Sequence, residues 1–398
     1  MDSRRFRNIA FLVHSWLGLH IFLVFGLIFL TGTLLVFITE IDTFANSTRQ
    51  SEDPNAYERA SLGQMFDSLQ AAGKADQVLE IRRSGVSWIA DRARARNYQS
   101  FYWLDPGSGN LRGQSPRTDI RRIIFEMHTT FMTDKAWAAK LVTLFSIPFI
   151  LFIVTGLISY RRFWKGYFRL PPRHQGARGW WGGVHRLAML WVLPFIMLMA
   201  LTSFYYLLAE FGLAVGEAHH EPPLATERAT LIPEGFDGAA LDRIVAVAQA
   251  AIPGLQPELV GFPAKRSAPI LIAGPGPALL SGPHGQVAFV DPVTFKVLEI
   301  NGVQSESLSN RIAQINQELH YGTWGGLTSR LLWLLFGIIG TLGMVAGALT
   351  YAARLAPPDG TGPGAFLRLW RTMSVLRWIL PLWLLGMVAV TASRYGPF

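Results

Sequence analysis

The stretch FLVHSWLGLHIFLVFGLIFL at residues 11–30 decides the fold, because it is apolar enough to enter lipid and yet carries His14 and His20. About 20 helical residues cross the 30 Å hydrocarbon core of a bilayer. The sequence has five runs of that character, and we expect membrane-spanning helices at 9–38, 137–160, 183–212, 330–353 and 374–393. The first run is longer than the apolar core of a signal peptide, so we expect an uncleaved helix there.

The composition agrees with a membrane protein and excludes several kinds of site. Hydrophobic residues make up 50% of the 398 residues and charged residues only 16%, which is more apolar than an average soluble domain. The sequence contains no cysteine. Disulfides, iron–sulfur clusters and covalent haem attachment through C-x-x-C-H are therefore excluded.

The distribution of arginine predicts the orientation of the chain. The N-terminal segment and the loops 161–181 and 354–373 are rich in arginine and poor in acidic residues. Such segments favour the cytoplasmic side of a membrane. We therefore expect a cytoplasmic N-terminus, with the C-terminus and two long segments, 40–134 and 213–328, on the other side. The formal net charge of +9 reflects this bias, and we expect no nucleic-acid partner.

The chain contains two copies of one pattern. RNIAFLVHSWLGLH (7–20) corresponds to RGWWGGVHRLAMLW (178–191), and the runs that begin with EMH at Glu126 and ELH at Glu318 also correspond. Each outer segment has a helical pattern, at 60–73 and 238–251, and later a β-rich run ending in Asp-Pro, which is typical of a turn. We therefore expect two small outer α+β units.

The repeat aligns four histidines in two pairs. His14 and His185 begin helices that enter from the cytoplasm, whereas His128 and His320 precede helices that return from the outer side. Each pair should therefore lie at one depth in the membrane. An ionisable residue in a membrane helix indicates function, and a metal is a strong partner for imidazole. Haem with two axial histidines fits best, because its flat ring can enter between helices lined by glycine.

Other residues are weaker candidates for this site. His20 lies six residues beyond His14, about 9 Å along the helix and on another face, but it could replace His14 as a ligand. Arg186, Arg121 and Arg122 are candidates to contact haem propionates by charge pairing. The alternative for any single interfacial histidine is a hydrogen-bonded residue of helix packing.

These residues resemble one known family, the PepSY-associated transmembrane proteins. The resemblance rests on the paired VH helix starts, on EMH and ELHYG before the return helices, and on the outer units with Asp-Pro turns. Within the family, the sequence is most similar to the ferrisiderophore reductases of the Gram-negative inner membrane, the FoxB type. That resemblance implies two haem b groups in a four-helix core, with a fifth peripheral helix and PepSY-like periplasmic units. It places His14 and His185 at the inner haem and His128 and His320 at the outer haem.

The function implied by the resemblance is the reduction of periplasmic ferric siderophores, an oxidoreductase activity that releases Fe(II). Because the sequence has no G-x-G-x-x-G motif after a strand, we expect a separate electron donor, either a cytoplasmic reductase or a quinol. Two other functions remain open: a permease for a siderophore or metal, and a membrane-anchored PepSY module that binds other proteins. The sequence nominates no catalytic acid, base or nucleophile.

Overall fold

The computed structural model divides the chain into two compact units, which are described separately. The helical unit comprises Met1–Phe37, Arg122–Gly216 and Leu319–Phe398, and the sheet unit comprises Ile38–Arg121 and Glu217–Glu318. The described residues are 3–45, 60–84, 87–92, 101–114, 120–133, 136–160, 162–215, 233–262, 269–277, 280, 282, 285–302, 307–357, 363–373, 377–378, 381–383, 385–386 and 389.

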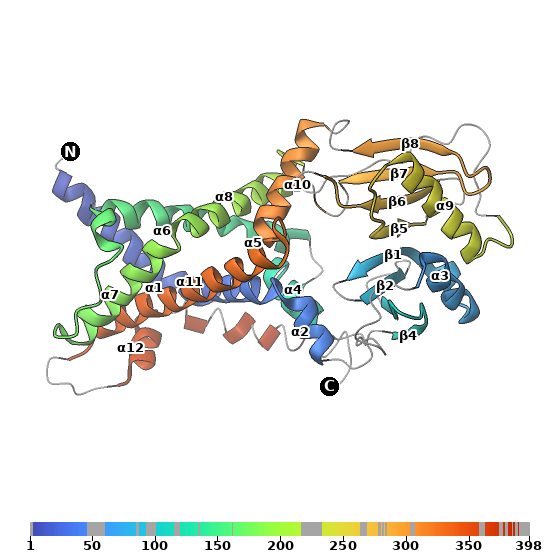
Figure 1. Cartoon of the computed structure of the whole chain (residues 1–398). Coiled ribbons are helices and arrows are strands. Elements are labelled where there is room, and N and C mark those ends of the chain that lie inside the picture. The colour runs from blue at the N-terminus through green and yellow to red at the C-terminus, as the bar shows by residue number, and fades with distance from the viewer. Residues whose placement is uncertain are drawn as a thin grey trace. The chain divides into compact units, whose positions relative to one another are not determined.

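Four helices of the helical unit are long and apolar enough to cross a membrane. They occupy Arg4–Leu35, Trp137–Ser159, Leu193–Glu210 and Gly326–Arg354, in agreement with four of the five predicted spans. Most of the fifth prediction, 374–393, lies outside the described residues. The helices of this unit, visible in Figure 1, are α1 (Ser3–Leu35), α4 (Ile120–Thr129), α5 (Ala136–Leu144), α6 (Ser146–Ser159), α7 (Gly176–Trp191), α8 (Leu193–Glu210), the end of α10 (Leu308–Tyr321), α11 (Gly326–Arg354) and α12 (Ala365–Thr372), with a 3₁₀ turn at Phe163–Gly166.

Proline divides two of the predicted spans. The run 183–212 forms two helices, α7 and α8, which meet at Val192, and Pro194 lies in the first turn of α8. The run 137–160 is divided in the same way at Phe145, with Pro148 in the first turn of α6. Proline has no amide hydrogen for the preceding turn, so it is tolerated at a helix start and not within a helix. The predicted continuous helix over 183–212 is therefore corrected to two segments.

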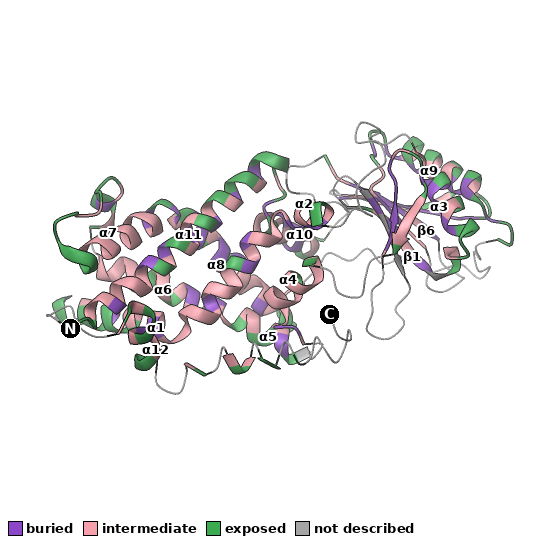
Figure 2. Cartoon of the chain, turned by 90° about the horizontal axis from the view of Figure 1, so that it is seen from below, coloured by how far each residue is buried: buried purple, intermediate pink, exposed green. Residues whose placement is uncertain are grey.

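The spanning helices pack through glycine and expose leucine and aromatic side chains. Gly337 and Gly340 of α11 face Thr33 and Phe29 of α1 so closely that a Cβ at either position would collide. Small residues at such contacts are typical of membrane helices. Large apolar side chains such as Leu335 and Leu342 are about half exposed or more, at 50% and 60%, and much of the outer helix surface in Figure 2 is green or pink. Such a surface suits lipid rather than water.

The sheet unit contains one antiparallel sheet of eight strands. Its order is β4-β3-β2-β1-β5-β6-β7-β8. The 40–134 and 213–328 segments, predicted as separate units, are joined because β1 pairs with β5, with Ile81 opposite Val260. A sequence pattern cannot identify the partner of an edge strand, so this join was missed. The bounds are β1 (Val78–Ser84), β2 (Ser87–Arg92), β3 (Phe101–Leu104), β4 (Leu111–Gln114), β5 (Leu259–Gly261), β6 (Ile270–Gly274), β7 (Gln286–Val290) and β8 (Val297–Gly302), with α2 at Ile38–Ala45 and a 3₁₀ turn at Ala75–Gln77.

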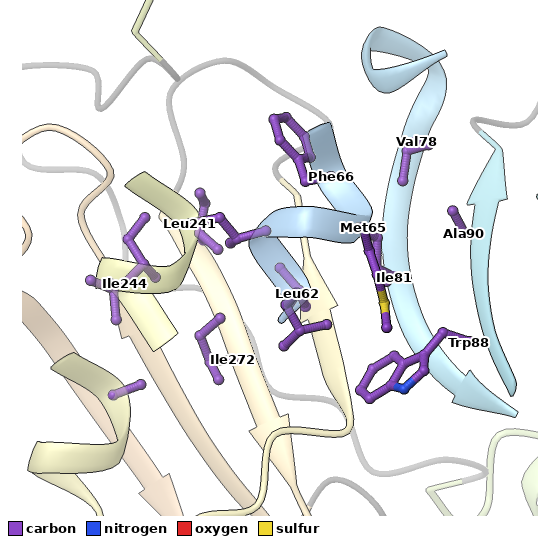
Figure 3. Packing of buried hydrophobic residues seen from close by; sticks show 14 of the residues in the cluster. Leu62, Met65, Phe66, Val78, Ile81, Trp88, Ala90, Leu241, Ile244 and Ile272 are labelled. Carbon is purple, nitrogen blue, oxygen red and sulfur yellow. The ribbon is translucent and has the colours of Figure 1, made fainter. Parts of the chain in front are cut away.

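Two helices cover one face of this sheet and form its core. They are α3 (Leu62–Ala71) and α9 (Gly238–Ala251), close to the predicted ranges 60–73 and 238–251. Apolar residues at helical spacing on α3 and α9 meet alternate residues of the strands, as an amphipathic helix on a pleated sheet requires. Figure 3 shows this contact between Leu62, Met65, Phe66, Leu241 and Ile244 of the helices and Ile81, Trp88 and Ile272 of the strands.

The two helices bind each other through reciprocal hydrogen bonds. The backbone N–H of Gly63 donates to the carboxylate of Asp242 at 2.8 Å, and that of Gly238 donates to Asp67 at 2.6 Å. Each carboxylate therefore satisfies amides at the N-terminus of the other helix, which also suits the helix dipole. A side chain at either glycine would collide with the carbonyl of the other.

The predicted Asp-Pro turns are present in both copies and have the same hydrogen bonds. Asp105 accepts the amides of Gly107 and Ser108, and Asp291 accepts those of Val293 and Thr294. Such side-chain bonds to the backbone two residues ahead are typical of aspartate in turns. The turns join β3 to β4 and β7 to β8, so the two copies build equivalent hairpins.

We expect Gly63→Ala to destabilise the sheet unit by about 1–3 kcal/mol, the usual cost of overpacking a close contact. The measurement is urea unfolding of the full chain in detergent, with proteolysis reporting the unfolded sheet unit. Gly302→Ala is the control: an added Cβ there has no neighbour closer than 3.9 Å, and we expect a change below about 0.5 kcal/mol. Equal midpoints for both variants would contradict the role assigned to the helix contact.

Candidate haem-binding sites

The structure brings His14 and His185 together as one pair. Their ring centroids are 6.2 Å apart, with an interplanar angle of 63°. The Nδ1 atom of His185 lies 2.8 Å from the carbonyl oxygen of Gly343 on α11. That of His14 lies 3.2 Å from the carbonyl oxygen of Phe152 and 3.3 Å from the hydroxyl of Thr155, both on α6. In both residues, Nδ1–H can donate to the backbone while Nε2 remains available.

His128 and His320 form the second pair, at the ends of α4 and α10. Their centroids are 6.3 Å apart, with an interplanar angle of 44°. Nδ1 of His128 donates to the carbonyl of Ile28 on α1 at 2.8 Å. Nδ1 of His320 lies 2.9 Å from the hydroxyl oxygen of Thr202 on α8, and that hydroxyl itself donates to the carbonyl of Leu198. Thr202 is therefore an acceptor for His320, and this pair has the same tautomer as the first.

Burial favours the neutral form of His128 and His320. Desolvation lowers the pKa of His128, and it also lowers the pKa of His320, with a smaller contribution from the nearby His128. A neutral imidazole with a protonated Nδ1 presents the lone pair of Nε2. That is the form of histidine that binds a metal.

The separation of the rings fits one metal atom held between each pair. A metal–nitrogen bond of about 2.0 Å on each side, added to the distance from nitrogen to ring centre, requires roughly 6 Å between centroids. The described residues contain no group of three or more His, Cys, Asp or Glu side chains that could hold a metal ion. A bare metal site uses three or four protein ligands, whereas haem iron needs only two axial ones. The donor set therefore fits haem.

Glycine determines how closely the imidazoles approach the neighbouring helices. A Cβ on Gly32 would lie 2.7 Å from His128, one on Gly347 would lie 2.9 Å from His185, and one on Gly156 would lie 3.4 Å from His14. Gly182 and Gly322, which lie close to His185 and His320 in the sequence, have other neighbours: Gly182 faces Thr350 and Gly322 faces Trp333.

Three small residues near the histidines were not identified from the sequence: Gly32, Thr202 and Thr31, whose hydroxyl lies 3.3 Å from Nδ1 of His128. Small residues are frequent in membrane helices and carry no distinguishing pattern.

The remaining candidates have separate contacts. Nδ1 of His20 lies 2.8 Å from the carbonyl of Trp16 on its own helix, and its ring contacts the Trp16 indole. The guanidinium of Arg186 donates to the carbonyl of Arg169 at 2.7 Å. Arg122 forms an ion pair with Glu126 at 2.7 Å. Arg121, also on α4, is half-buried. None of these contacts brings His20 into either histidine pair.

Aromatic side chains fill the bundle between the two pairs. At one end, Phe152 contacts the ring of His14 at a centroid distance of 5.5 Å. At the other end, the indole N–H of Trp333 donates to the carbonyl of Leu319, the residue before His320, at 3.0 Å. Successive ring contacts connect Phe152 to Trp333 through Phe25, Phe29 and Phe195.

Comparison with protein families assigns the chain to one family. The model of the PepSY-associated TM region matches residues 11–354, which include all four paired histidines. A comparison with curated proteins gave no significant match. The family match covers most of the sequence and agrees with the four apolar helices of the structure. The chain is a membrane protein of the PepSY-associated TM family.

Proposed function

We propose that this protein is an inner-membrane electron-transfer protein that holds two haem b groups and reduces ferric siderophores on the periplasmic side. The observation that carries the proposal is the shared geometry of the two pairs. In both, the ring centroids are 6.2–6.3 Å apart and each Nδ1 lies within hydrogen-bond distance of a carbonyl or hydroxyl. Histidines that served only helix packing would not need to meet in two pairs with the same ring separation.

In this proposal His14 and His185 hold one haem, and His128 and His320 hold the other. Haem supplies a one-electron iron couple when it is bound. The hydrogen bonds at Nδ1 fix the tautomer and the orientation of each ring and make Nε2 a better ligand. The carbonyl of Gly343, for example, prevents His185 from rotating away from His14.

Aromatic side chains pack between the two sites. Helix α1 contributes His14 to one pair, and its Ile28–Thr31 segment contacts His128 of the other pair. These two places on α1 are about 21–26 Å apart along the helix axis, at 1.5 Å per residue. Phe195 and Trp333 in this interval are buried, with exposed fractions of 8% and 7%. Close packing of this kind leaves little room for water between the two sites.

The chemistry of siderophores explains why such a protein would act on them. Hard oxygen ligands hold Fe(III) tightly and Fe(II) much less tightly, so one electron loosens the iron without destroying the chelator. The arginine-rich loop 161–181 supports a cytoplasmic side for the inner pair. The electron then comes from a separate donor, a cytoplasmic reductase or a quinol.

Haem content tests the proposed ligands directly. We expect purified protein to carry two haems per chain, measured by the Soret band and the pyridine haemochrome. His185→Ala and His320→Ala should each reduce the content to about one, because one axial ligand of one site is lost. His20→Ala is the matched control and should retain both. Colourless wild-type protein, or full haem in all the ligand variants, would exclude the proposed cofactor.

The contact between Gly32 and His128 provides a second test. We expect Gly32→Ala to displace the His128 ring and weaken haem binding at the outer pair by about tenfold, because the added carbon lies within the ring's contact distance. Gly26→Ala on the same helix has no neighbour within 4 Å and should retain normal binding. Haem dissociation is measured by transfer to apomyoglobin, and equal rates for the two variants would contradict the packing described.

The substrate class is tested by reoxidation of the reduced protein. We expect protein reduced by dithionite to lose its ferrous α band rapidly when ferric hydroxamate or catecholate chelates are added, with Fe(II) trapped by ferrozine. Gallium chelates of the same siderophores, which bind but cannot be reduced, should leave the band unchanged. Transport of gallium chelates into proteoliposomes without any haem oxidation would instead favour a permease. Binding of a protein partner without either activity would favour an interaction module.

A further inference from the structure

Two arginines lie at the same level of the bundle, on the N-terminal side of His14 in α1. Helices α7 and α11 run antiparallel, because Gly347 faces His185 whereas Gly182 faces Thr350. Arg178 lies seven residues before His185, and Arg354 lies seven residues after Gly347. Seven residues are two helical turns, about 10 Å, so both arginines lie on the helix faces that form the histidine site.

The surroundings of Arg354 place it between the two ligand helices. Its guanidinium lies over the ring of Phe11, 4.7 Å from the centroid, and Phe11 is one helical turn from His14. Arg178 is near enough to Arg354 for the two charges to repel each other. The Nε atom of Arg354 is buried and has no hydrogen-bond partner. Helices α1, α7 and α11 contain no aspartate or glutamate within their bounds.

Two nearby guanidinium groups, one with a buried and unpartnered Nε and neither with an acidic residue on these helices, favour the binding of an anion. Guanidinium binds carboxylate or phosphate through paired, charge-assisted hydrogen bonds. We propose that Arg178 and Arg354 form an anion site that receives the propionate carboxylates of the haem held by His14 and His185. This inference rests on the proposed function. It adds to Arg186, the propionate contact expected from the sequence, whose guanidinium donates to the carbonyl of Arg169 at 2.7 Å.

The test compares Arg354→Gln and Arg178→Gln with the wild type in full-length protein. Arg173→Gln is the control, because Arg173 is an exposed arginine that precedes helix α7 and its loss changes the net charge equally. We expect each site variant to lose the inner haem to apomyoglobin about tenfold faster, the effect of one lost charged hydrogen bond. The inner midpoint potential should also fall, because removing a positive charge favours ferric iron. Arg354→Lys should restore part of both effects.

Further measurements distinguish the possible explanations of the result. The outer haem reports correct folding in every variant and should keep its potential and its dissociation rate. Haem dimethyl ester, which has no free carboxylates, should bind the inner site of the wild type weakly and be insensitive to Arg354→Gln. Unchanged haem retention and potential in the site variants would overturn the inference while leaving the proposed function intact. If those variants instead lose only phosphatidylglycerol bound in nanodiscs, the site binds lipid phosphate and the inference is wrong. Wild-type protein without haem would overturn both proposals.

Discussion

A histidine inside a membrane bundle must satisfy two ring nitrogens where there is no water, and the arrangement of this protein follows from that constraint. An unpaired polar group in hydrocarbon costs several kcal/mol, roughly 2–7 depending on the reference. Backbone carbonyls within helices are already bonded to amides, but each oxygen has a second lone pair. Phe152, Ile28 and Gly343 offer that lone pair to Nδ1. In the proposed function, the iron of a haem would be the partner of the opposite nitrogen, Nε2.

The need to reach a backbone carbonyl explains the small residues around each histidine. A ring can approach the backbone of a neighbouring helix only where that helix lacks a large side chain. Gly156, Gly347 and Gly32 provide this access on α6, α11 and α1. At His320 the hydroxyl of Thr202 replaces the carbonyl as acceptor. A hydroxyl reaches further than a backbone oxygen, so this histidine needs no glycine.

The sequence predicted the pairing of the histidines but not the atoms that hold them. The pairing could be predicted because the two histidines of each pair should lie at the same depth in the membrane. His14 and His185 begin helices at one side of the membrane, whereas His128 and His320 precede helices that begin at the other side. The acceptor at Nδ1 depends on how two helices rotate about their axes, which a hydropathy pattern does not specify. The division of α7 from α8 could have been read from Pro194. The join of β1 to β5 could not, because strand pairing over such a distance in sequence depends on the whole domain.

Each half of the chain builds half of every site. His14 is held by α6 and His128 by α1, all from the first half, whereas His185 is held by α11 and His320 by α8, all from the second. The pairs form only when the halves meet. The sheet unit follows the same rule, because Asp242 of the second half bonds the helix start of the first, and Asp67 does the reverse. A half chain would therefore leave its imidazoles without partners and its sheet with an open edge at β1 or β5. This mutual dependence is a physical reason for keeping both copies in one polypeptide, where the partner half is always present.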